Sequence, residues 1–141
     1  MPLIARWPGR IAPATTSDHV SAFWDFLPTA ASIAGVAPPA GLDGISYLPA
    51  LTGGTDQGKH DYLYWEFTEQ GGKQAIRQSD WKAVRLNVAE NPQGPLELYN
   101  LTSDPSEEKN VGAELPDVVA HLAVLMAGAR TESALFPFKP A

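Results

Sequence analysis

Hydrophobic and polar positions alternate in the second half of the chain, as they do in strands with one buried face. From Trp81 onward, one face would carry Trp81, Ala83 and Arg85, and the residues between them would lie on the other. This run and three similar ones are bounded by Gly, Pro, Asn and Asp. They predict strands over 62–67, 74–77, 81–86 and 96–101, with a tight turn at 79–80. Short connections between them favour an antiparallel sheet.

Helical spacing replaces this alternation near the C-terminus. Pro116 suits the first position of a helix, and Asp117 suits the positive end of its dipole. The apolar residues that follow recur three and four positions apart and form one stripe, made of Val118, Leu122, Leu125 and Met126. We therefore predict an α+β fold for residues 58–141, a four-stranded antiparallel sheet packed with a C-terminal helix.

Residues 1–57 have a different character, rich in Pro, Gly and Ala and poor in charge. Their pattern predicts a short helix over 23–34 that ends at Gly35, an irregular connector over 35–41, and one or two helical turns over 48–51 that end at Gly53. This is too little regular structure to enclose a core. We predict that 1–57 form the edge of a larger domain and that 58–141 form a smaller one.

Composition removes several classes of function. The 141 residues include no Cys, which excludes disulfides, thiolate zinc sites and a cysteine nucleophile. A net charge of −6 leaves no basic stripe for a nucleic-acid backbone. The longest apolar run, 118–127, has about half of the ~20 residues that a membrane span needs. Residues 1–8 lack the basic and apolar regions of a signal peptide. We expect no nucleic-acid partner and no membrane span.

The histidines give no clear site. His19 follows Asp18, and this pair is compatible with turn capping by the carboxylate or with an imidazole oriented for acid–base work. His60 lies in a charged turn, where we expect it to be solvated. His121 adjoins the apolar stripe, in a structural or solvent-facing role.

The carboxylates and glycines of the first predicted hairpin leave alternatives open. Glu66 and Glu69 could act as acid and base, hold a cation, or be two solvated charges at a strand end. Gly71-Gly72-Lys73 places a cation after two glycines, but no strand-to-helix context accompanies it, which favours a loop over a phosphate site. No serine lies in a G-x-S-x-G nucleophile elbow.

The order of the segments carries more information than any one residue. The chain contains the following short segments in this order: 2-PLIARWPG-9, 11-IAP-13, 25-DFLPT-29, 34-AG-35, 42-LDGIS-46, 48-LP-49, 65-WEF-67, 81-WK-82, 97-ELYNL-101 and 104-DPSE-107 with Asn110. This succession resembles the C-terminal portion of the arylsulfatase-type sulfatases, in the alkaline phosphatase superfamily. The resemblance covers essentially the whole chain.

The resemblance implies a large α/β catalytic domain, of which 1–57 would be a remnant, followed by the small subdomain of 58–141. It also implies hydrolysis of sulfate esters, aryl or carbohydrate, by a formylglycine made from the Cys or Ser of a C/S-x-P-x-R motif. A calcium ion held by Asp and Asn side chains would bind the sulfate. The family further suggests export to a periplasm or beyond.

This sequence lacks the motifs that carry the catalytic reaction in that family. It has no Cys, no S-x-P-x-R run and no Asp-Asn dipeptide. In the family these elements precede the segment that matches 2–9, so we expect no catalytic residue and no metal ligand in this chain. Loops of this region border the active-site mouth in the family, which makes His19, Glu66, Glu69, Gln70 and Lys73 the candidate substrate-side residues. Thr68 stands where close relatives often carry His.

Two hypotheses follow. The first is a C-terminal sulfatase fragment, inactive alone, whose partner is the missing N-terminal domain or a second copy bound through the exposed former interface. The second is a stand-alone, non-catalytic binding or partner module derived from the same subdomain. Under either, the chain itself needs no cofactor, and calcium and formylglycine belong to the full-length enzyme.

Overall fold

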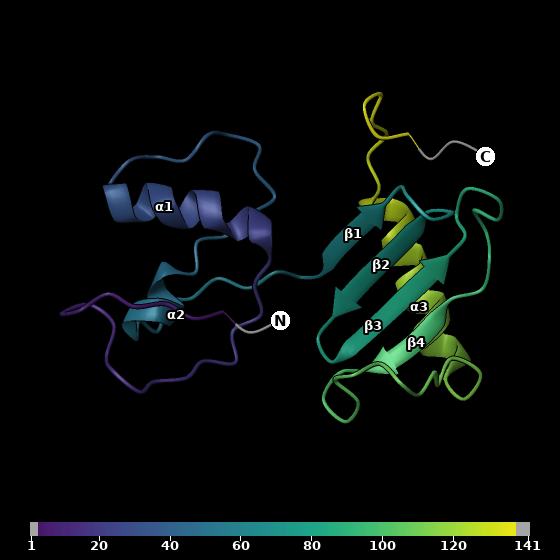
Figure 1. The fold of residues 1–141 in the computed structure, drawn as a ribbon, viewed down its shortest axis with the longest axis horizontal. Coiled ribbons are helices and arrows are strands. Elements are labelled where there is room, and N and C mark those ends of the chain that lie inside the picture. Colours follow the sequence, from purple (N-terminus) through teal and green to yellow (C-terminus); the bar gives the residue numbers. More distant parts are fainter. Residues whose placement is uncertain (1–2, 138–141) are drawn as a thin grey trace. The chain divides into compact units, whose positions relative to one another are not determined.

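The computed structural model describes residues 3–137, and its contacts divide the chain into two compact units, Met1–His60 and Asp61–Ala141. Figure 1 shows the helices α1 and α2 in the first unit and four strands with the helix α3 in the second. The α+β class and the four-stranded antiparallel sheet predicted above are confirmed. That the first unit is the end of a larger α/β domain stays a prediction.

The first unit has little regular structure. A 3-10 turn, η1 (Phe23–Asp25), leads directly into α1 (Phe26–Ala34), so the predicted helix over 23–34 is present with a tightened first turn. Gly35 ends α1 in the left-handed conformation (φ 69°), where it donates its N–H to the Ser32 carbonyl. The second helix, α2 (Leu48–Thr52), ends in the same way at Gly53 (φ 79°).

A buried carboxylate joins the segments of this unit. Asp25 is 1% exposed, and its Oδ2 accepts the Ala22 N–H at 2.7 Å while its Oδ1 accepts the Ile45 N–H at 2.8 Å. The Thr29 hydroxyl adds a second link, because it donates to the Asp25 carbonyl and accepts the Tyr47 N–H at 3.0 Å. The 45–47 segment is thereby fixed to α1 by polar contacts in place of a large apolar core.

The second unit contains the sheet, in the order β1-β2-β3-β4. Its strands are β1 (Leu63–Phe67), β2 (Lys73–Gln78), β3 (Trp81–Leu86) and β4 (Glu97–Asn100), all antiparallel to their neighbours. Gln78 pairs with Trp81, so the turn between β2 and β3 has two residues, as predicted. The register aligns Tyr64, Ile76, Ala83 and Leu98 in one row across all four strands.

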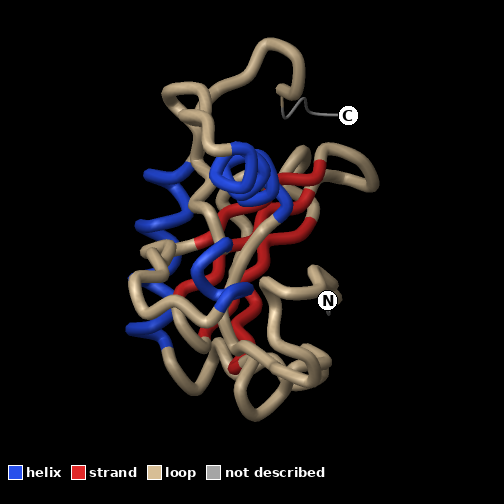
Figure 2. Tube along the Cα trace, turned by 90° about the vertical axis from the view of Figure 1, so that its left-hand side faces the viewer, coloured by secondary structure: helices blue, strands red, loops and turns tan. Residues whose placement is uncertain are grey.

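Helix α3 (Pro116–Ala129) covers this row. Pro116 occupies the first helical position, as predicted. Leu122 and Met126 are buried with Ile76, Ala83 and Leu98, and Val118 and Leu125 pack at the margin of this cluster. The predicted apolar stripe is therefore confirmed as the inner face of the helix. Figure 2 shows α3 as a layer of its own along one side of the strands. Within residues 3–137, no helix is long and apolar enough to cross a membrane.

Candidate functional site

The imidazole of His60 is paired with the buried Asp25. Its Nε2 lies 2.8 Å from Asp25 Oδ1, and the His60 side chain is only 11% exposed. The expectation that His60 is solvated is therefore wrong. Its sequence neighbours Lys59 and Asp61 are charged, but the partner that decides its environment lies 35 residues earlier. The Asp25 carboxylate thus has three hydrogen-bond partners, two backbone amides and this ring.

His19 lies in a loop of the same unit and is partly buried. Its backbone N–H donates to the Ser17 hydroxyl at 3.2 Å, so this amide is capped by Ser17 and not by Asp18. Burial lowers the pKa of the His19 imidazole; the Asp25 carboxylate opposes this effect, and His60 and Lys59 reinforce it. A histidine held toward its neutral form offers a hydrogen-bond donor and an acceptor at neutral pH.

Glu66, in β1, points toward the helix side of the sheet. Its Oε1 lies 2.9 Å from Arg130 Nε, just after α3, and accepts a hydrogen bond from the Tyr64 hydroxyl. Both charged side chains are mostly buried, at 20% and 17% exposure. The interpretation of Glu66 as a solvated edge charge is therefore wrong. Arg130 also pairs with Glu132, and although burial alone would lower the pKa of Arg130, these carboxylates raise it.

Two further polar side chains complete this cluster. Glu66, Gln74 and Arg85 are aligned on adjacent strands, in the row beside Tyr64, Ile76 and Ala83. Gln74 Nε2 donates to the Tyr64 hydroxyl at 2.9 Å, and Gln74 Oε1 accepts from Arg85 Nη1 at 3.1 Å.

The cluster favours the protonated phenol of Tyr64. Burial and the hydrogen bond to Glu66 raise the Tyr64 pKa well above its ordinary value. The Glu66 carboxylate is paired with the Arg130 guanidinium and covered by the Tyr64 phenol. The ion pair links the sheet to the residue that follows α3. A general base would need a carboxylate open to substrate.

The remaining candidates of this hairpin are Glu69 and Gln70, on the connection from β1 to β2, and Lys73, the first residue of β2. Lys73 Nζ donates to Gln70 Oε1 at 3.3 Å and lies 5.7 Å from the centre of the Phe67 ring. Phe67 pairs with Lys73 and follows Glu66, so both face away from α3 while Glu66 faces toward it. Glu69 and Gln70 are therefore exposed beside a half-buried Lys73, and Lys73 and Glu66 lie on opposite faces of the sheet.

The backbone of this connection is fixed although its side chains are open. Gln70, Gly71 and Gly72 are all left-handed, with φ of 54°, 81° and 77°. The Val88 and Ala89 amides donate to the carbonyls of Gly72 and Gly71 at 3.1 and 2.9 Å. The left-handed conformation favours glycine at position 71, where a Cβ would lie 2.9 Å from Asn87 Oδ1 and would displace that side-chain amide. The Gly-Gly-Lys run is a structured loop, which supports the loop interpretation.

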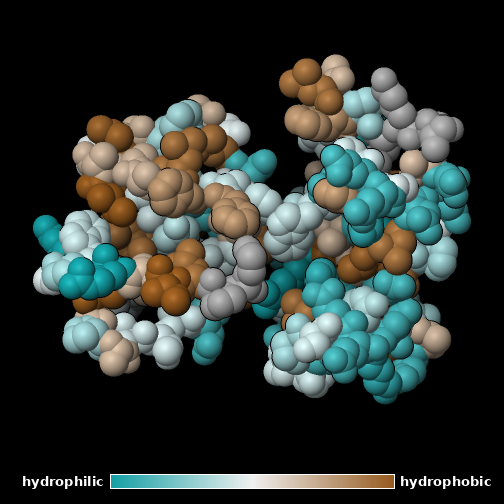
Figure 3. All heavy atoms as spheres, viewed as in Figure 1, coloured by the Kyte–Doolittle hydropathy of each residue, from teal (hydrophilic) through white to brown (hydrophobic). Residues whose placement is uncertain are grey.

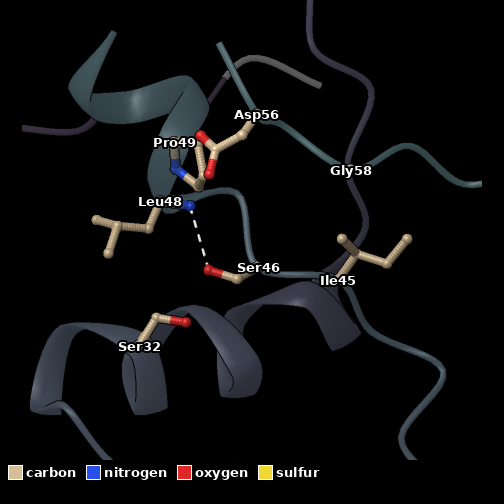
Figure 4. Close-up of a pocket in the computed structure, with 7 residues that line it drawn as sticks. All are labelled: Ser32, Ile45, Ser46, Leu48, Pro49, Asp56 and Gly58. Carbon is tan, nitrogen blue, oxygen red and sulfur yellow. Dashed lines mark hydrogen bonds between the residues drawn. The ribbon is translucent and has the colours of Figure 1, made fainter. Parts of the chain in front are cut away.

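The first unit contains an open hollow of about 390 Å³, drawn in Figure 4. The Ser46 hydroxyl at its wall accepts the Leu48 N–H at 3.3 Å, and the Ser32 hydroxyl donates to the Pro28 carbonyl at 2.8 Å. Both hydroxyls are therefore engaged with backbone groups. Neither has a histidine base among the residues that line the hollow, so the pair needed for nucleophilic catalysis is not formed there.

No group of three or more His, Asp or Glu side chains in the described range 3–137 is arranged to hold a metal ion. The sequence also has no Cys and no S-x-P-x-R run to become a formylglycine. The residues present therefore do not fit the calcium or the formylglycine that the family resemblance implies. His121 does not add to a site, because its Nε2 is engaged with Gln78 Oε1 at 2.7 Å.

Comparison with known proteins decides the family. The sequence family described as N-sulphoglucosamine sulphohydrolase, C-terminal, matches residues 1–131. The chain belongs to this sulfatase family. It is 30% identical over 132 residues to arylsulfatase K from Danio rerio, covering 89% of this chain and 25% of that protein. It is 33% identical over 122 residues to N-acetylglucosamine-6-O-sulfatase from Bacteroides thetaiotaomicron, covering 79% of this chain and 21% of that protein.

A solved structure agrees with this assignment. That of a 2-O GAG sulfatase superposes with a TM-score of 0.63 at 27% identity, over 74% of this chain and 23% of that one. The sulfatase relatives thus match at sequence and fold together, and the resemblance inferred from the ordered segments is confirmed. The chain spans about a quarter of the length of the curated relatives it matches.

Sequence reasoning missed Asp25, Tyr64, Gln74 and Arg130 as members of polar clusters. Cross-strand alignment would have suggested the row of Glu66, Gln74 and Arg85 once the register was known. Arg130 and Asp25 carry no local signal, since each meets its partner across a long stretch of chain.

Proposed function

We propose that this chain is the C-terminal portion of a sulfate ester hydrolase and is inactive without the catalytic portion. The supporting observation is the family match over residues 1–131, combined with a sequence that contains neither a formylglycine precursor nor an Asp-Asn pair. Enzymes lower activation barriers by about 8–23 kcal/mol, which requires a nucleophile and groups that stabilise the transition state. Both would come from the catalytic portion, together with calcium.

The substrate class we propose is a sulfate ester on a carbohydrate. One relative is named for N-acetylglucosamine 6-O-sulfate chemistry, and the matching solved structure is that of a 2-O GAG sulfatase. Arylsulfatase K is named for the other class, so the names of the relatives include both; we propose the sulfated sugar because two of the three relatives cited above are named for a sugar or GAG sulfate. The pocket that would select the sugar lies largely outside this chain.

Within this chain, we propose that Glu69, Gln70 and Lys73 face the substrate. The loop that carries them is hydrogen-bonded through its Gly71 and Gly72 carbonyls to the amides of residues 88 and 89. These bonds would hold the loop in place without a bound ligand. The Lys73 ammonium would contribute a positive charge for a sulfate or a carboxylate of the sugar, and Gln70 would contribute an amide. We propose His19 as a further neutral polar contact.

Glu66 has a supporting role in this proposal. Its carboxylate is bound to Arg130 and Tyr64 on the helix side of the sheet, at the end of the strand that leads into the loop. It would act on substrate binding through the position of that loop.

The test is turnover of N-acetylglucosamine 6-sulfate and of 4-nitrophenyl sulfate by the purified chain, with calcium and after its removal by a chelator. We expect no turnover above buffer in either case. Turnover that depends on calcium would overturn the proposal, because the chain would then hold its own catalytic centre.

The alternative is a stand-alone binding module. The observation that favours it is the closed core of the second unit, in which Ile76, Leu98, Leu122 and Met126 are fully buried. Under this alternative the full chain would bind a sulfated glycan tightly without any sulfatase partner. The two readings are separated by whether such binding occurs with the purified chain alone.

A further inference from the structure

One row of the sheet, on the face opposite α3, carries two exposed apolar side chains on either side of a cation. Phe67 in β1 pairs with Lys73 in β2, and Lys73 pairs with Leu86 in β3. Phe67 is 44% exposed and Leu86 40%, and Lys73 between them is half-buried. We call these three residues the outer row. Figure 1 shows α3 behind the strands, so Figure 3, drawn in the same view, shows the face of the outer row, where hydrophobic and hydrophilic residues lie side by side.

The ring of Phe67 has an open surface. Lys73 Nζ lies 5.7 Å from its centre, near the limit of about 6 Å for a cation–π contact, so the ammonium does not cover the ring. Leu63, on the same face at the start of β1, is only 3% exposed. The apolar surface of this strand is therefore open only at the end that leads into the loop. A single exposed apolar residue is common on protein surfaces, and what distinguishes Phe67 is the cation beside it.

The outer row is held in place before any ligand binds. Phe67 and Lys73 lie on either side of the loop, and the chain that leaves β3 at Leu86 continues to Val88 and Ala89. The amides of these last two residues donate to the loop carbonyls at 3.1 and 2.9 Å. A surface that is already ordered loses little conformational entropy when it binds a ligand.

The chemistry of the outer row complements a sulfated sugar. A sugar ring presents C–H groups on its faces, which pack against an aromatic ring, and it carries hydroxyl and sulfate groups at its edge. The hydrogen-bond partner of Lys73 Nζ is the neutral Gln70 Oε1 at 3.3 Å, which leaves the charge of the ammonium uncompensated by that partner. A purely apolar ligand would gain nothing from the cation, and inorganic sulfate would gain nothing from the ring. A sugar that carries a sulfate uses both.

We propose that Phe67 is a substrate-positioning residue, whose ring packs against the face of a sugar unit while Lys73 binds the sulfate on that unit. This inference rests on the proposed function, and it adds an aromatic surface to the polar side chains of Glu69, Gln70 and Lys73. Leu86, on the other side of Lys73, extends the apolar surface.

The experiment measures the binding of N-acetylglucosamine 6-sulfate and of unsulfated N-acetylglucosamine to the full chain by amide chemical shifts in NMR spectra. Phe67→Ala removes the ring, Phe67→Trp replaces it with another aromatic ring, and Lys73→Gln removes the charge. Phe23→Ala is the matched control, because it removes an 81% exposed phenylalanine from the first unit. Circular dichroism of each variant would verify that it folds.

We expect the sulfated sugar to shift the amides of residues 67, 73 and 86. Its affinity should be equal for the wild-type chain and Phe23→Ala, about fivefold lower for Phe67→Ala, and restored in Phe67→Trp. The unsulfated sugar should also bind Phe67→Ala more weakly than wild type. In Lys73→Gln, the two sugars should bind with equal affinity, because the charge that distinguishes them is absent.

Two results would overturn the inference and leave the proposed function intact. One is equal affinity of wild type and Phe67→Ala for the sulfated sugar, with shifts confined to residues 69–72. The other is the absence of any shift at about 50 mM sugar, a concentration that detects even very weak binding. Release of free sulfate in the same samples, dependent on calcium, would instead count against the proposed function, whether or not the sugar contacts Phe67.

Discussion

Arg130 Nε lies 2.9 Å from Glu66 Oε1 and so joins the end of α3 to strand β1 of the sheet. The helix already packs on the sheet through Leu122 and Met126, but those contacts lie along its middle. The ion pair fixes the end of the helix and the strand that leads into the loop of Glu69, Gln70 and Lys73. The second unit thus has an apolar centre and a polar clamp at one edge.

Removing one member of this clamp should destabilise the chain. Arg130→Met leaves the mostly buried Glu66 carboxylate without its cation, and we expect the free energy of unfolding of the second unit to fall by about 1–3 kcal/mol. Urea unfolding of the full chain would measure it. Lys109→Met is the control, because Lys109 and its partner Glu114 are both largely exposed and their pair should contribute little. Equal losses of unfolding free energy in the two variants would contradict a stabilising role for the Arg130–Glu66 pair.

Tyr64 should make stability depend on alkaline pH. Its pKa in the folded chain is raised, whereas an unfolded tyrosine has a pKa of about 10. Below about pH 10 the phenol is protonated in both states, and its contribution to stability is complete. Above that value the unfolded state loses a proton that the folded state retains, so stability should fall as pH rises.

The measurement is the unfolding free energy between about pH 8 and pH 11, compared with Tyr64→Phe. The variant should lose about 1 kcal/mol at neutral pH and show a shallower alkaline slope. If the unfolding free energy of both proteins fell equally steeply with pH, the alkaline loss of stability would come from other tyrosines.

Asp25 should stabilise the first unit by holding the backbone around Ile45 in place. Asp25→Ala removes the acceptor for the amides of Ala22 and Ile45 and for the His60 ring, and we expect amide hydrogen exchange at residue 45 to accelerate at least tenfold. Asp18→Ala, in an exposed loop of the same unit, should leave that exchange rate unchanged. Unaltered protection of the Ile45 amide in Asp25→Ala would show that the carboxylate is dispensable.

Lys73 should affect substrate affinity more than turnover. In the complex of this chain with its catalytic portion, Lys73→Gln removes a charge proposed to meet the anionic substrate, and we expect KM for a sulfated sugar to rise about 5- to 20-fold with kcat changed less than twofold. Lys109→Gln, which neutralises a largely exposed lysine of the same unit, is the matched control. A loss of kcat with unchanged KM would contradict a role in binding.

The sequence predicted the elements of this fold better than their polar contacts. Alternation in β3 and helical spacing in α3 depend on neighbours a few residues apart, so local pattern was sufficient for both. Gly35 and Gly53 ended their helices as expected because a left-handed residue is a local requirement.

The errors have a common physical cause. His60 and Glu66 were interpreted from charged or polar sequence neighbours, yet each is buried against a partner far along the chain, Asp25 and Arg130. A carboxylate looks solvated in sequence until the fold supplies its cation. A substrate-binding role for Glu69, Gln70 and Lys73 stays a prediction, because the substrate would be held mainly by residues outside this chain.

The most direct test of the central claim is to read the DNA upstream of the Met1 codon in all frames. The account predicts an open frame that encodes a C/S-x-P-x-R motif and an Asp-Asn pair, the elements that this chain does not contain. An unrelated or intergenic upstream sequence would contradict it and would leave a stand-alone module whose ligand is to be sought.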